Sequence, residues 1–247
     1  MNKPKILFLD IETSPNISYT WGKWEQDVIE FKEEWHILSY SAKWLGGEQV
    51  TEGMCDFNDK TDKTLVKRIY QLFDEADIIV AHNGDQFDIK KCQARFTFYG
   101  FKPTSPFKTV DTKKIAKKYF NFNSNSLNDL GISLGLGKKR KHDGFDTWLG
   151  CMNGDKKSWD IMKKYNAQDV LLLEKIYTHF LPWISSHPNL SLYINKEVCP
   201  NCGSNDLQSR GYSLTLGGKF RRFQCQDCGH WSRSKVKDEE INSLRHI

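Results

Sequence analysis

The chain has 247 residues, of which 38% are hydrophobic and 27% are charged, and its formal net charge is +5 at pH 7. This length suits one sizeable domain with a small appendage. No apolar run approaches the roughly 18 residues that a membrane span needs, and the N-terminus lacks the pattern of a secretory signal. We therefore expect a cytoplasmic protein without membrane contact, and the positive charge is compatible with a polyanionic partner.

Hydrophobic periodicity predicts strands mixed with helices over the first 180 residues. Short apolar or alternating runs indicate strands, and apolar residues three or four positions apart indicate helices. The expected strands are residues 6–9, 37–45, 49–55, 78–81 and 108–111, and the expected helices are 59–75, 87–99, 112–119, 126–135 and 157–180. This mixture predicts an α/β domain with a mixed sheet.

The first predicted strand ends in two acidic residues that are separated by one position. Side chains alternate across a strand, so Asp10 and Glu12 would project on the same side if the strand continues that far. Two like charges held side by side repel, and neither can be buried cheaply. A divalent cation would relieve both costs, although this pair alone is better explained by a strand that becomes polar as it leaves the core.

Two later segments supply further acidic side chains. Asp88 lies at the turn into a predicted helix, where it could face a neighbouring strand end or simply cap the helix. Tyr165 and Asp169 are four residues apart on the long predicted helix and therefore share one of its faces. Each feature has an ordinary structural explanation when taken singly, and only their combination indicates a site.

The three acidic segments form an ordered set of motifs: Asp-x-Glu-Thr at 10–13, Asn-x-x-x-Phe-Asp at 83–88 and Tyr-x-x-x-Asp at 165–169. This set resembles the DEDD superfamily of 3′–5′ exonucleases. The final Tyr is typical of its tyrosine-bearing branch, and the middle motif looks most like the proofreading exonuclease domains of family B DNA polymerases and their stand-alone relatives. The resemblance covers about residues 3–182.

The resemblance implies a ribonuclease-H-like fold, in which a mixed sheet is flanked by helices, and two Mg²⁺ or Mn²⁺ ions held by four carboxylates. Asp10 would bridge both ions, while Glu12 and Asp169 would help to hold the ion that activates water. Asp88 would act through bound water or the second ion, and Tyr165 would orient the attacking water. Two such ions, roughly 4 Å apart, can support phosphodiester hydrolysis. The candidate contacts to substrate are Thr13, Asn83 and Phe87.

Four of the seven cysteines form two Cys-x-x-Cys pairs near the C-terminus, and each pair is followed by a glycine. Four thiolates complete a closed tetrahedral Zn²⁺ site, and the stretch between the pairs predicts a hairpin. This arrangement is similar to a zinc ribbon, so we expect one structural Zn²⁺. Two redox-active dithiols are the alternative, but neither pair has a thioredoxin-like context. The expected ligands are Cys199, Cys202, Cys225 and Cys228.

These patterns predict four segments along the chain. The expected divisions are a nuclease domain at 1–184, a linker at 185–198, a zinc ribbon at 199–236 and a polar tail at 237–247.

The predicted function is metal-dependent 3′–5′ exonuclease activity on DNA, preferentially single-stranded. Trp21 and Trp24 are candidates for base stacking, and the zinc ribbon would aid nucleic-acid or partner binding. The expected partners are nucleic acid, with DNA favoured over RNA, and a separate polymerase or a replication or repair protein. The alternatives are a 3′–5′ exoribonuclease and a nucleic-acid-binding scaffold without catalysis.

Overall fold

The structure, a computed structural model, describes residues 3–24, 27–53 and 61–238. Cys55, part of the predicted strand 49–55, the start of the predicted helix 59–75 and most of the predicted tail 237–247 lie outside these residues. The contacts divide the chain into two compact units: Lys5–Ile176, and a second unit that begins at Tyr177 and includes the residues before Lys5. The two units are described separately.

The first unit is built on a five-stranded mixed sheet with the order β5-β4-β1-β6-β7. Strand β1 is central, with β4 antiparallel on one side and β6 parallel on the other. The β4–β5 hairpin and the parallel β6–β7 pair complete the sheet, which confirms the predicted mixed topology. The strands are β1 (Ile6–Thr13), β4 (Ile37–Trp44), β5 (Gln49–Gly53), β6 (Ile78–Ala81) and β7 (Lys108–Asp111).

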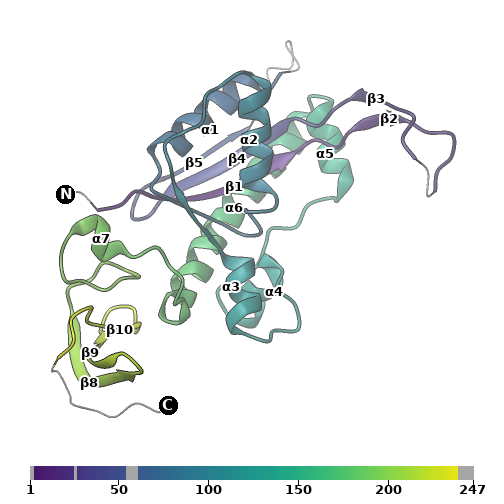
Figure 1. Cartoon of the computed structure of the whole chain (residues 1–247). Coiled ribbons are helices and arrows are strands. Elements are labelled where there is room, and N and C mark those ends of the chain that lie inside the picture. Colours follow the sequence, from purple (N-terminus) through teal and green to yellow (C-terminus); the bar gives the residue numbers. More distant parts are fainter. Residues whose placement is uncertain (1–2, 25–26, 54–60, 239–247) are drawn as a thin grey trace. The chain divides into compact units, whose positions relative to one another are not determined.

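Helices cover both faces of this sheet, with α1 and α2 on one face and α6 on the other (Figure 1). Among the described residues, no helix is long and apolar enough to cross a membrane. The helices of this unit are α1 (Lys63–Glu75), α2 (Asp88–Phe98), α3 (Thr112–Tyr119), α4 (Leu127–Ser133), α5 (Phe145–Met152) and α6 (Lys156–Phe180), the last of which continues into the second unit.

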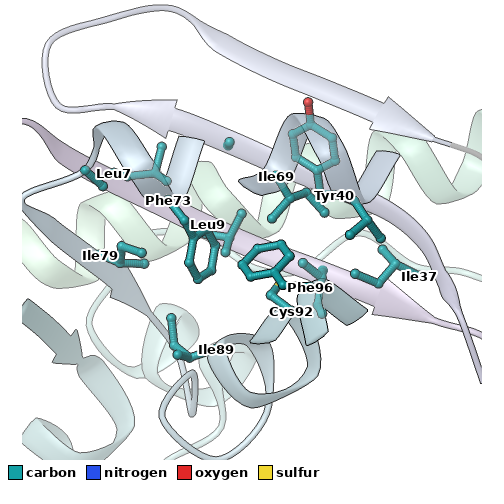
Figure 2. Packing of buried hydrophobic residues seen from close by; sticks show 14 of the residues in the cluster. Leu7, Leu9, Ile37, Tyr40, Ile69, Phe73, Ile79, Ile89, Cys92 and Phe96 are labelled. Carbon is teal, nitrogen blue, oxygen red and sulfur yellow. The ribbon is translucent and has the colours of Figure 1, made fainter. Parts of the chain in front are cut away.

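The main hydrophobic cluster fixes which way β1 faces. Leu7, Leu9 and Ile11 are buried against Phe73 of α1 and Phe96 of α2 (Figure 2). Because successive side chains of a strand point to opposite faces, the alternate positions of β1 face α6. Asp10 and Glu12 therefore lie on the α6 side of the sheet, as their spacing predicts.

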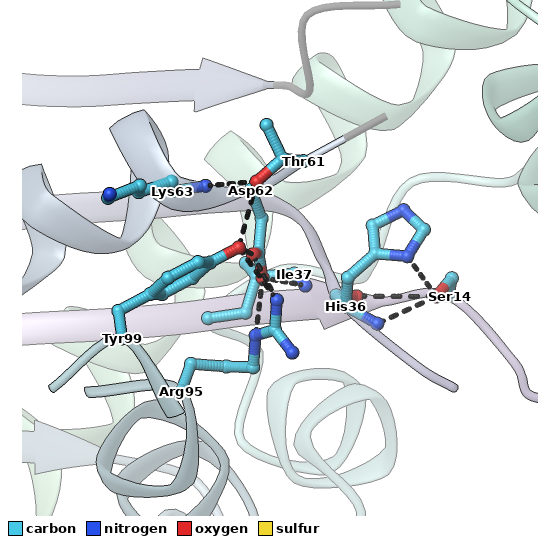
Figure 3. Close-up of polar contacts among 8 residues, drawn as sticks. All are labelled: Ser14, His36, Ile37, Thr61, Asp62, Lys63, Arg95 and Tyr99. Carbon is cyan, nitrogen blue, oxygen red and sulfur yellow. Dashed lines mark hydrogen bonds and ion pairs between the residues drawn. The ribbon is translucent and has the colours of Figure 1, made fainter. Parts of the chain in front are cut away.

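A buried polar network fixes the start of β4 beside the end of β1 (Figure 3). The Asp62 carboxylate accepts hydrogen bonds from the Ile37 backbone N–H at 2.8 Å and the Tyr99 hydroxyl at 2.6 Å, and it forms an ion pair with Arg95. These bonds occupy the Asp62 side chain, which therefore does not cap α1 although it directly precedes that helix. Helix α1 accordingly begins at Lys63, later than the predicted position 59.

Three short elements of the first unit were not predicted. Strands β2 (Ile17–Tyr19) and β3 (Glu30–Glu33) pair as a two-stranded arm that projects from the main sheet (Figure 1). Trp21 and Trp24 lie in the segment between them and are 91% and 75% exposed. Helix α5 was also unpredicted, because its eight residues are mostly apolar and lack a polar face to reveal a helical period.

The second unit carries a three-stranded antiparallel sheet of order β10-β9-β8. Strands β8 (Leu207–Thr215) and β9 (Gly218–Cys225) form the hairpin that the sequence predicts between the two cysteine pairs, and β10 (Trp231–Arg233) pairs with β9. A 3₁₀ turn (Leu181–Trp183) and a short helix α7 (Leu190–Ile194) precede the sheet. Helix α7 lies within the segment that we expected to be a linker.

Candidate metal centres

Three carboxylates from two elements meet on the α6 side of the sheet. One oxygen each from Asp10, Glu12 and Asp169 can be chosen so that all lie within 4.8 Å of one another. Asp10 and Glu12 alternate along β1, and Asp169 projects from α6. Asp169 is fully buried, whereas Asp10 and Glu12 are half-buried. The site is thus closed on the helix side and accessible along β1.

Asn166 holds Asp10 in place, a role that the sequence patterns did not reveal. Its side-chain amide donates to the Asp10 carboxylate and to the Asp10 backbone carbonyl, the latter at 3.2 Å. Ser39 of β4 in turn donates to the amide oxygen of Asn166 at 3.2 Å. Asn166 is fully buried, so this chain of bonds links β4, α6 and the carboxylate that the resemblance places between two ions.

The fourth predicted carboxylate, Asp88, lies beside the group of three and is not a member of it. Asp88 begins α2, and its Oδ1 accepts a hydrogen bond from the Ile11 backbone N–H at 3.0 Å. Gly84 allows the preceding turn to close tightly, since a Cβ at this position would lie 2.3 Å from the Ala81 side chain. This bond fixes the Asp88 carboxylate against β1, and its action through bound water or a second ion stays a prediction.

Burial and mutual repulsion disfavour ionisation throughout the cluster. Burial raises the pKa of Asp10 well above its usual value, and the neighbouring Asp88, Glu12 and Asp169 raise it further. Burial likewise raises the pKa of Glu12 to about 8 and of Asp88 to about 7. A cation that binds here would reverse these shifts, because nearby positive charge favours the ionised carboxylate.

One lysine already supplies part of this positive charge. Lys139 Nζ lies 2.7 Å from Asp169 Oδ2 and donates to the Tyr165 hydroxyl at 2.7 Å. Its ion pair with Asp169 raises the pKa of Lys139 despite the opposing effect of burial. No sequence motif distinguished Lys139 from its neighbours, because it lies within the basic run 138–141. The structure brings it into the acidic site.

The loop that carries Lys139 is held by hydrogen bonds from its backbone to α4. Asn128 Oδ1 accepts a hydrogen bond from the Lys139 backbone N–H at 3.1 Å, and the Gly131 carbonyl accepts from Leu136 N at 2.9 Å. The two backbones approach so closely that a Cβ on Gly131 would lie 2.6 Å from the Gly137 carbonyl oxygen. The position of Lys139 is thus a consequence of how this loop packs on α4.

The residues present fit divalent cations of the Mg²⁺ or Mn²⁺ type. The group offers carboxylate oxygens, the ligands that these hard cations prefer. Within the described part of the chain, Asp169 Oδ1 is buried and makes no hydrogen bond, although a buried polar atom normally has a partner. Lys139 brings one ammonium to the three clustered carboxylates, so a further cation would be favourable there. Asp10, Glu12 and Asp169 are the residues that would hold an ion.

Tyr165 lies one helical turn before Asp169 and is 7% exposed. The rings of His142 and Trp148 pack edge-on against it, with centroids 4.8 and 6.2 Å from the Tyr165 ring. Burial and the neighbouring Asp169 raise the pKa of the Tyr165 phenol. The phenol therefore stays protonated at neutral pH and is suited to hydrogen bonding, not to acting as a strong base.

The three predicted substrate contacts lie at the ends of neighbouring elements. Thr13 ends β1 and is half-buried, and Phe87 directly precedes α2 and is 37% exposed. Asn83 has a left-handed backbone with φ of 68°, and its N–H donates to Asp111 Oδ1 at 3.0 Å. No side chain of the three belongs to the carboxylate group, and their contact with substrate stays a prediction.

Without added Mg²⁺ or Mn²⁺, the carboxylate cluster should make the free energy of unfolding fall as the pH rises from about 4 to 8. The pKa values of Glu12 and Asp88 rise from 4.5 and 3.8 to about 8 and about 7 in the folded chain. In this range the folded chain holds protons that the unfolded chain has released, so a rise in pH favours unfolding. Urea unfolding of wild type and Glu12→Gln at several pH values measures this fall. It should be smaller in Glu12→Gln, and equal falls in both proteins would contradict the prediction.

The second cluster consists of the four cysteines of the second unit. One Sγ from each can be chosen so that all four lie within 4.8 Å of one another. The Cys199–Cys228 and Cys202–Cys225 sulfur atoms are 3.6 Å apart. This separation is far beyond the roughly 2.05 Å of a disulfide, and it is close to the about 3.8 Å edge of a tetrahedron with Zn–S bonds of about 2.3 Å. The cluster therefore fits a zinc ribbon.

The two cysteine turns have matching backbone geometry. Gly203 N donates to the Cys199 carbonyl at 2.9 Å, and Gly229 N donates to the Cys225 carbonyl at 3.0 Å. Gly203 and Gly229 have φ values of 75° and 79°, in the left-handed region that glycine adopts most easily. Each turn thus presents two sulfur atoms from one tight loop.

Purified protein should contain about one zinc per chain, and Cys202→Ser should lose it. A three-stranded ribbon of this size buries little apolar surface, so the metal would supply much of its folding free energy. Elemental analysis after dialysis measures the zinc content, with Cys92→Ser as the control because Cys92 is buried in the first unit. A full complement of zinc in Cys202→Ser would contradict the assignment.

Comparisons with known proteins agree with this architecture. The sequence matches the RNase H superfamily over residues 7–181. A comparison with curated proteins found no match. Among solved structures, the chain is similar to the family B DNA polymerase from the hyperthermophilic archaeon Pyrobaculum calidifontis, with a TM-score of 0.56 and 14% sequence identity. The similarity covers 73% of this chain and 25% of that chain, so this chain corresponds to a quarter of the polymerase's length.

The superfamily match and the structural similarity confirm the predicted ribonuclease-H-like fold. The matched residues contain the five-stranded sheet except for its first residue, Ile6, and they include the three clustered carboxylates. The match also spans well over half of the sequence. The chain therefore belongs to the RNase H superfamily.

Proposed function

We propose that this chain is a metal-dependent 3′–5′ exonuclease that hydrolyses single-stranded DNA from its 3′ end. Membership in the RNase H superfamily supports a nuclease. The observation that carries the proposal is the group formed by Asp10, Glu12 and Asp169 with Tyr165 beside it. This set completes the motifs that resemble the tyrosine-bearing exonucleases. The proposed nuclease domain comprises residues 1–184, and the proposed zinc ribbon comprises 199–236.

Two Mg²⁺ or Mn²⁺ ions bound at the carboxylates would activate water, stabilise the leaving oxygen and relieve the charge on the phosphate. Asp10, Glu12 and Asp169 provide their oxygen ligands, with Asp88 placed beside them through its bond to β1. Asn166 keeps the Asp10 carboxylate in one orientation. A ligand that is held in this way loses little further freedom on binding, which favours a defined geometry for the reaction.

Tyr165 and Lys139 would act on the attacking water and on the phosphate of the substrate. The protonated Tyr165 hydroxyl can orient a water molecule through a hydrogen bond, and its ring is held by His142 and Trp148. Lys139 donates to the same hydroxyl, which leaves the phenol oxygen polarised. The Lys139 ammonium also brings positive charge to the place where a phosphate would gain negative charge, and such preorganised charge stabilises a transition state.

End-labelled oligonucleotides test the polarity and the substrate together. A single-stranded DNA and an RNA of the same sequence, each labelled at the 5′ end or the 3′ end, are incubated with Mg²⁺ or Mn²⁺. We expect a 5′-label to give a ladder of shortened products and a 3′-label to be released at once as mononucleotide, with DNA degraded faster than RNA. A 3′-label that shortens stepwise would refute the polarity, and faster degradation of RNA would make the protein an exoribonuclease.

Tyr165→Phe should slow hydrolysis about ten- to a hundredfold and leave metal binding intact. The substitution removes only the hydroxyl that would orient water, and such contributions to proton transfer and positioning are typically of this order or larger. Single-turnover hydrolysis and Mn²⁺ titration measure the two effects separately. Tyr70→Phe is the matched control, because Tyr70 stacks on Phe101 beside the core cluster, on the opposite side of the sheet from α6. Unchanged turnover in Tyr165→Phe would remove this residue from the mechanism.

A further inference from the structure

One face of the ribbon sheet carries two arginines and two aromatic rings in alternation. Side chains alternate along a strand, and directly paired residues share a face. Phe220 and Arg222 therefore lie on the same face of β9. On β10, Arg233 pairs with Arg222, and Trp231 pairs with Gln224, which is also on this face. We call these four residues, Phe220, Arg222, Trp231 and Arg233, the Arg–aromatic face.

The arginines of this face lie over its rings. The Arg222 guanidinium is 4.7 Å from the Trp231 ring centroid, and the Arg233 guanidinium is 4.4 Å from the Phe220 ring centroid. Arg222 Nε also donates to the Arg210 carbonyl at 3.1 Å, which restricts the orientation of its planar group. Two flat cationic groups are thus held beside two flat rings, with Trp231 43% exposed.

The charge of this face is not compensated by acidic side chains. Between Cys199 and Asp238 the sequence has seven Lys or Arg residues and three Asp residues, so the segment accounts for most of the chain's formal net charge of +5. Within the described residues, neither Arg222 nor Arg233 takes part in an ion pair, whereas Arg221 on the opposite face pairs with Asp238 at 3.3 Å. In the described part of the chain, Arg222 and Arg233 are thus cations without an acidic partner on the side that carries Phe220 and Trp231.

We propose that the Arg–aromatic face binds single-stranded nucleic acid, with bases stacked on the exposed Trp231 ring and the guanidinium planes and phosphates neutralised by the arginines. Aromatic rings and Arg planes accept any base by stacking, and adjacent positive charge follows the backbone. In duplex nucleic acid the bases stay stacked on one another, so a duplex would bind only through the positive charge of the arginines. The proposal rests on the proposed nuclease function, because it makes the ribbon a second contact for the same substrate.

Binding is measured on the full chain with Asp10→Asn as background, so that the nucleic acid stays intact. The affinity for a fluorescent oligothymidylate is measured at several salt concentrations, for this chain and for three variants of it that carry further substitutions. Arg222→Gln with Arg233→Gln removes both cations of the face, and Trp231→Ala removes one ring. Arg221→Gln is the matched control, since it removes the same charge from the same strand on the opposite face. Zinc content and circular dichroism confirm that each ribbon is folded.

The double arginine variant should weaken binding at least tenfold and lower the salt dependence by about two counterions. Trp231→Ala should weaken binding about five- to a hundredfold with an unchanged salt dependence, as expected for a lost stacking contact. Arg221→Gln should change affinity less than threefold. Equal losses in Arg221→Gln and the double variant, or an equal loss for duplex and single strand in Trp231→Ala, would overturn the proposal.

Hydrolysis of a dinucleotide separates this proposal from the proposed function. A dinucleotide has only one scissile bond and two bases, so it leaves little nucleic acid for a second site to bind. Chains with Arg222→Gln and Arg233→Gln but an intact Asp10 should therefore cleave it as fast as wild type. Weak binding of the oligothymidylate together with normal dinucleotide cleavage supports the ribbon proposal. Normal binding by the double arginine variant in the Asp10→Asn background overturns it whether or not cleavage occurs, and absent degradation of the end-labelled oligonucleotides by wild type overturns the nuclease function alone.

Discussion

Asp10→Asn should reduce divalent-metal-dependent hydrolysis by roughly a thousandfold or more. The carboxylate is one of the three that cluster within 4.8 Å, and it is the one that Asn166 holds in place. Asn is nearly the same size but offers a neutral amide, so the fold is kept while the charge that holds a cation is lost. A thousandfold decrease corresponds to about 4 kcal/mol of lost transition-state stabilisation.

The rate should be measured in single turnover with saturating Mg²⁺ and again with Mn²⁺. Asp85→Asn provides a matched control, because it removes the same charge from a carboxylate that pairs with Lys114 and lies outside the clustered group. The control should retain nearly all activity. An Asp10→Asn protein that keeps more than about a tenth of the wild-type rate would show that hydrolysis does not depend on this metal centre.

Much of the fold follows from short-range patterns in the sequence. Alternation along β1 placed Asp10 and Glu12 on one side, and helical spacing placed Tyr165 and Asp169 on one face of α6. These rules hold because one face of each element is buried, so its apolar side chains must recur with the period of a strand or a helix. The predicted helix 112–119 has the observed bounds of α3, since Asp111 accepts hydrogen bonds from the N–H groups of the first turn.

The remaining features depend on contacts that no local pattern records. Lys139 reaches the carboxylates because its loop packs on Gly131 and Asn128 of α4, so its neighbours in sequence do not mark it. Asn166 likewise acts on Asp10 across 156 positions of sequence. The strands of the projecting arm, β2 and β3, are three and four residues long with mostly exposed side chains, so they show no buried period.

Asp62→Ala should lower the free energy of unfolding by about 3–5 kcal/mol, the range found when one partner of a buried ion pair is removed. Asp62 is fully buried and pairs with Arg95, whose side chain is 11% exposed. Without the carboxylate, Arg95 keeps a buried charge that has no counterion. The Ile37 N–H and the Tyr99 hydroxyl lose their acceptor as well. A loss of this size is a large part of the 5–15 kcal/mol that typically stabilises a domain.

Urea unfolding of the zinc-loaded chain measures this loss, with tryptophan fluorescence as the signal because six of the eight tryptophans lie in the first unit. Glu75→Ala is the control, because it breaks the Lys5–Glu75 pair, whose side chains are both more than half exposed. An exposed pair of this kind contributes about 0–1 kcal/mol. The difference between the losses of unfolding free energy in Asp62→Ala and Glu75→Ala measures the effect of burying the Asp62 network, and not the effect of ion pairing in general. Equal losses would mean that water reaches Asp62, and the end of β1 would then not be fixed by this network.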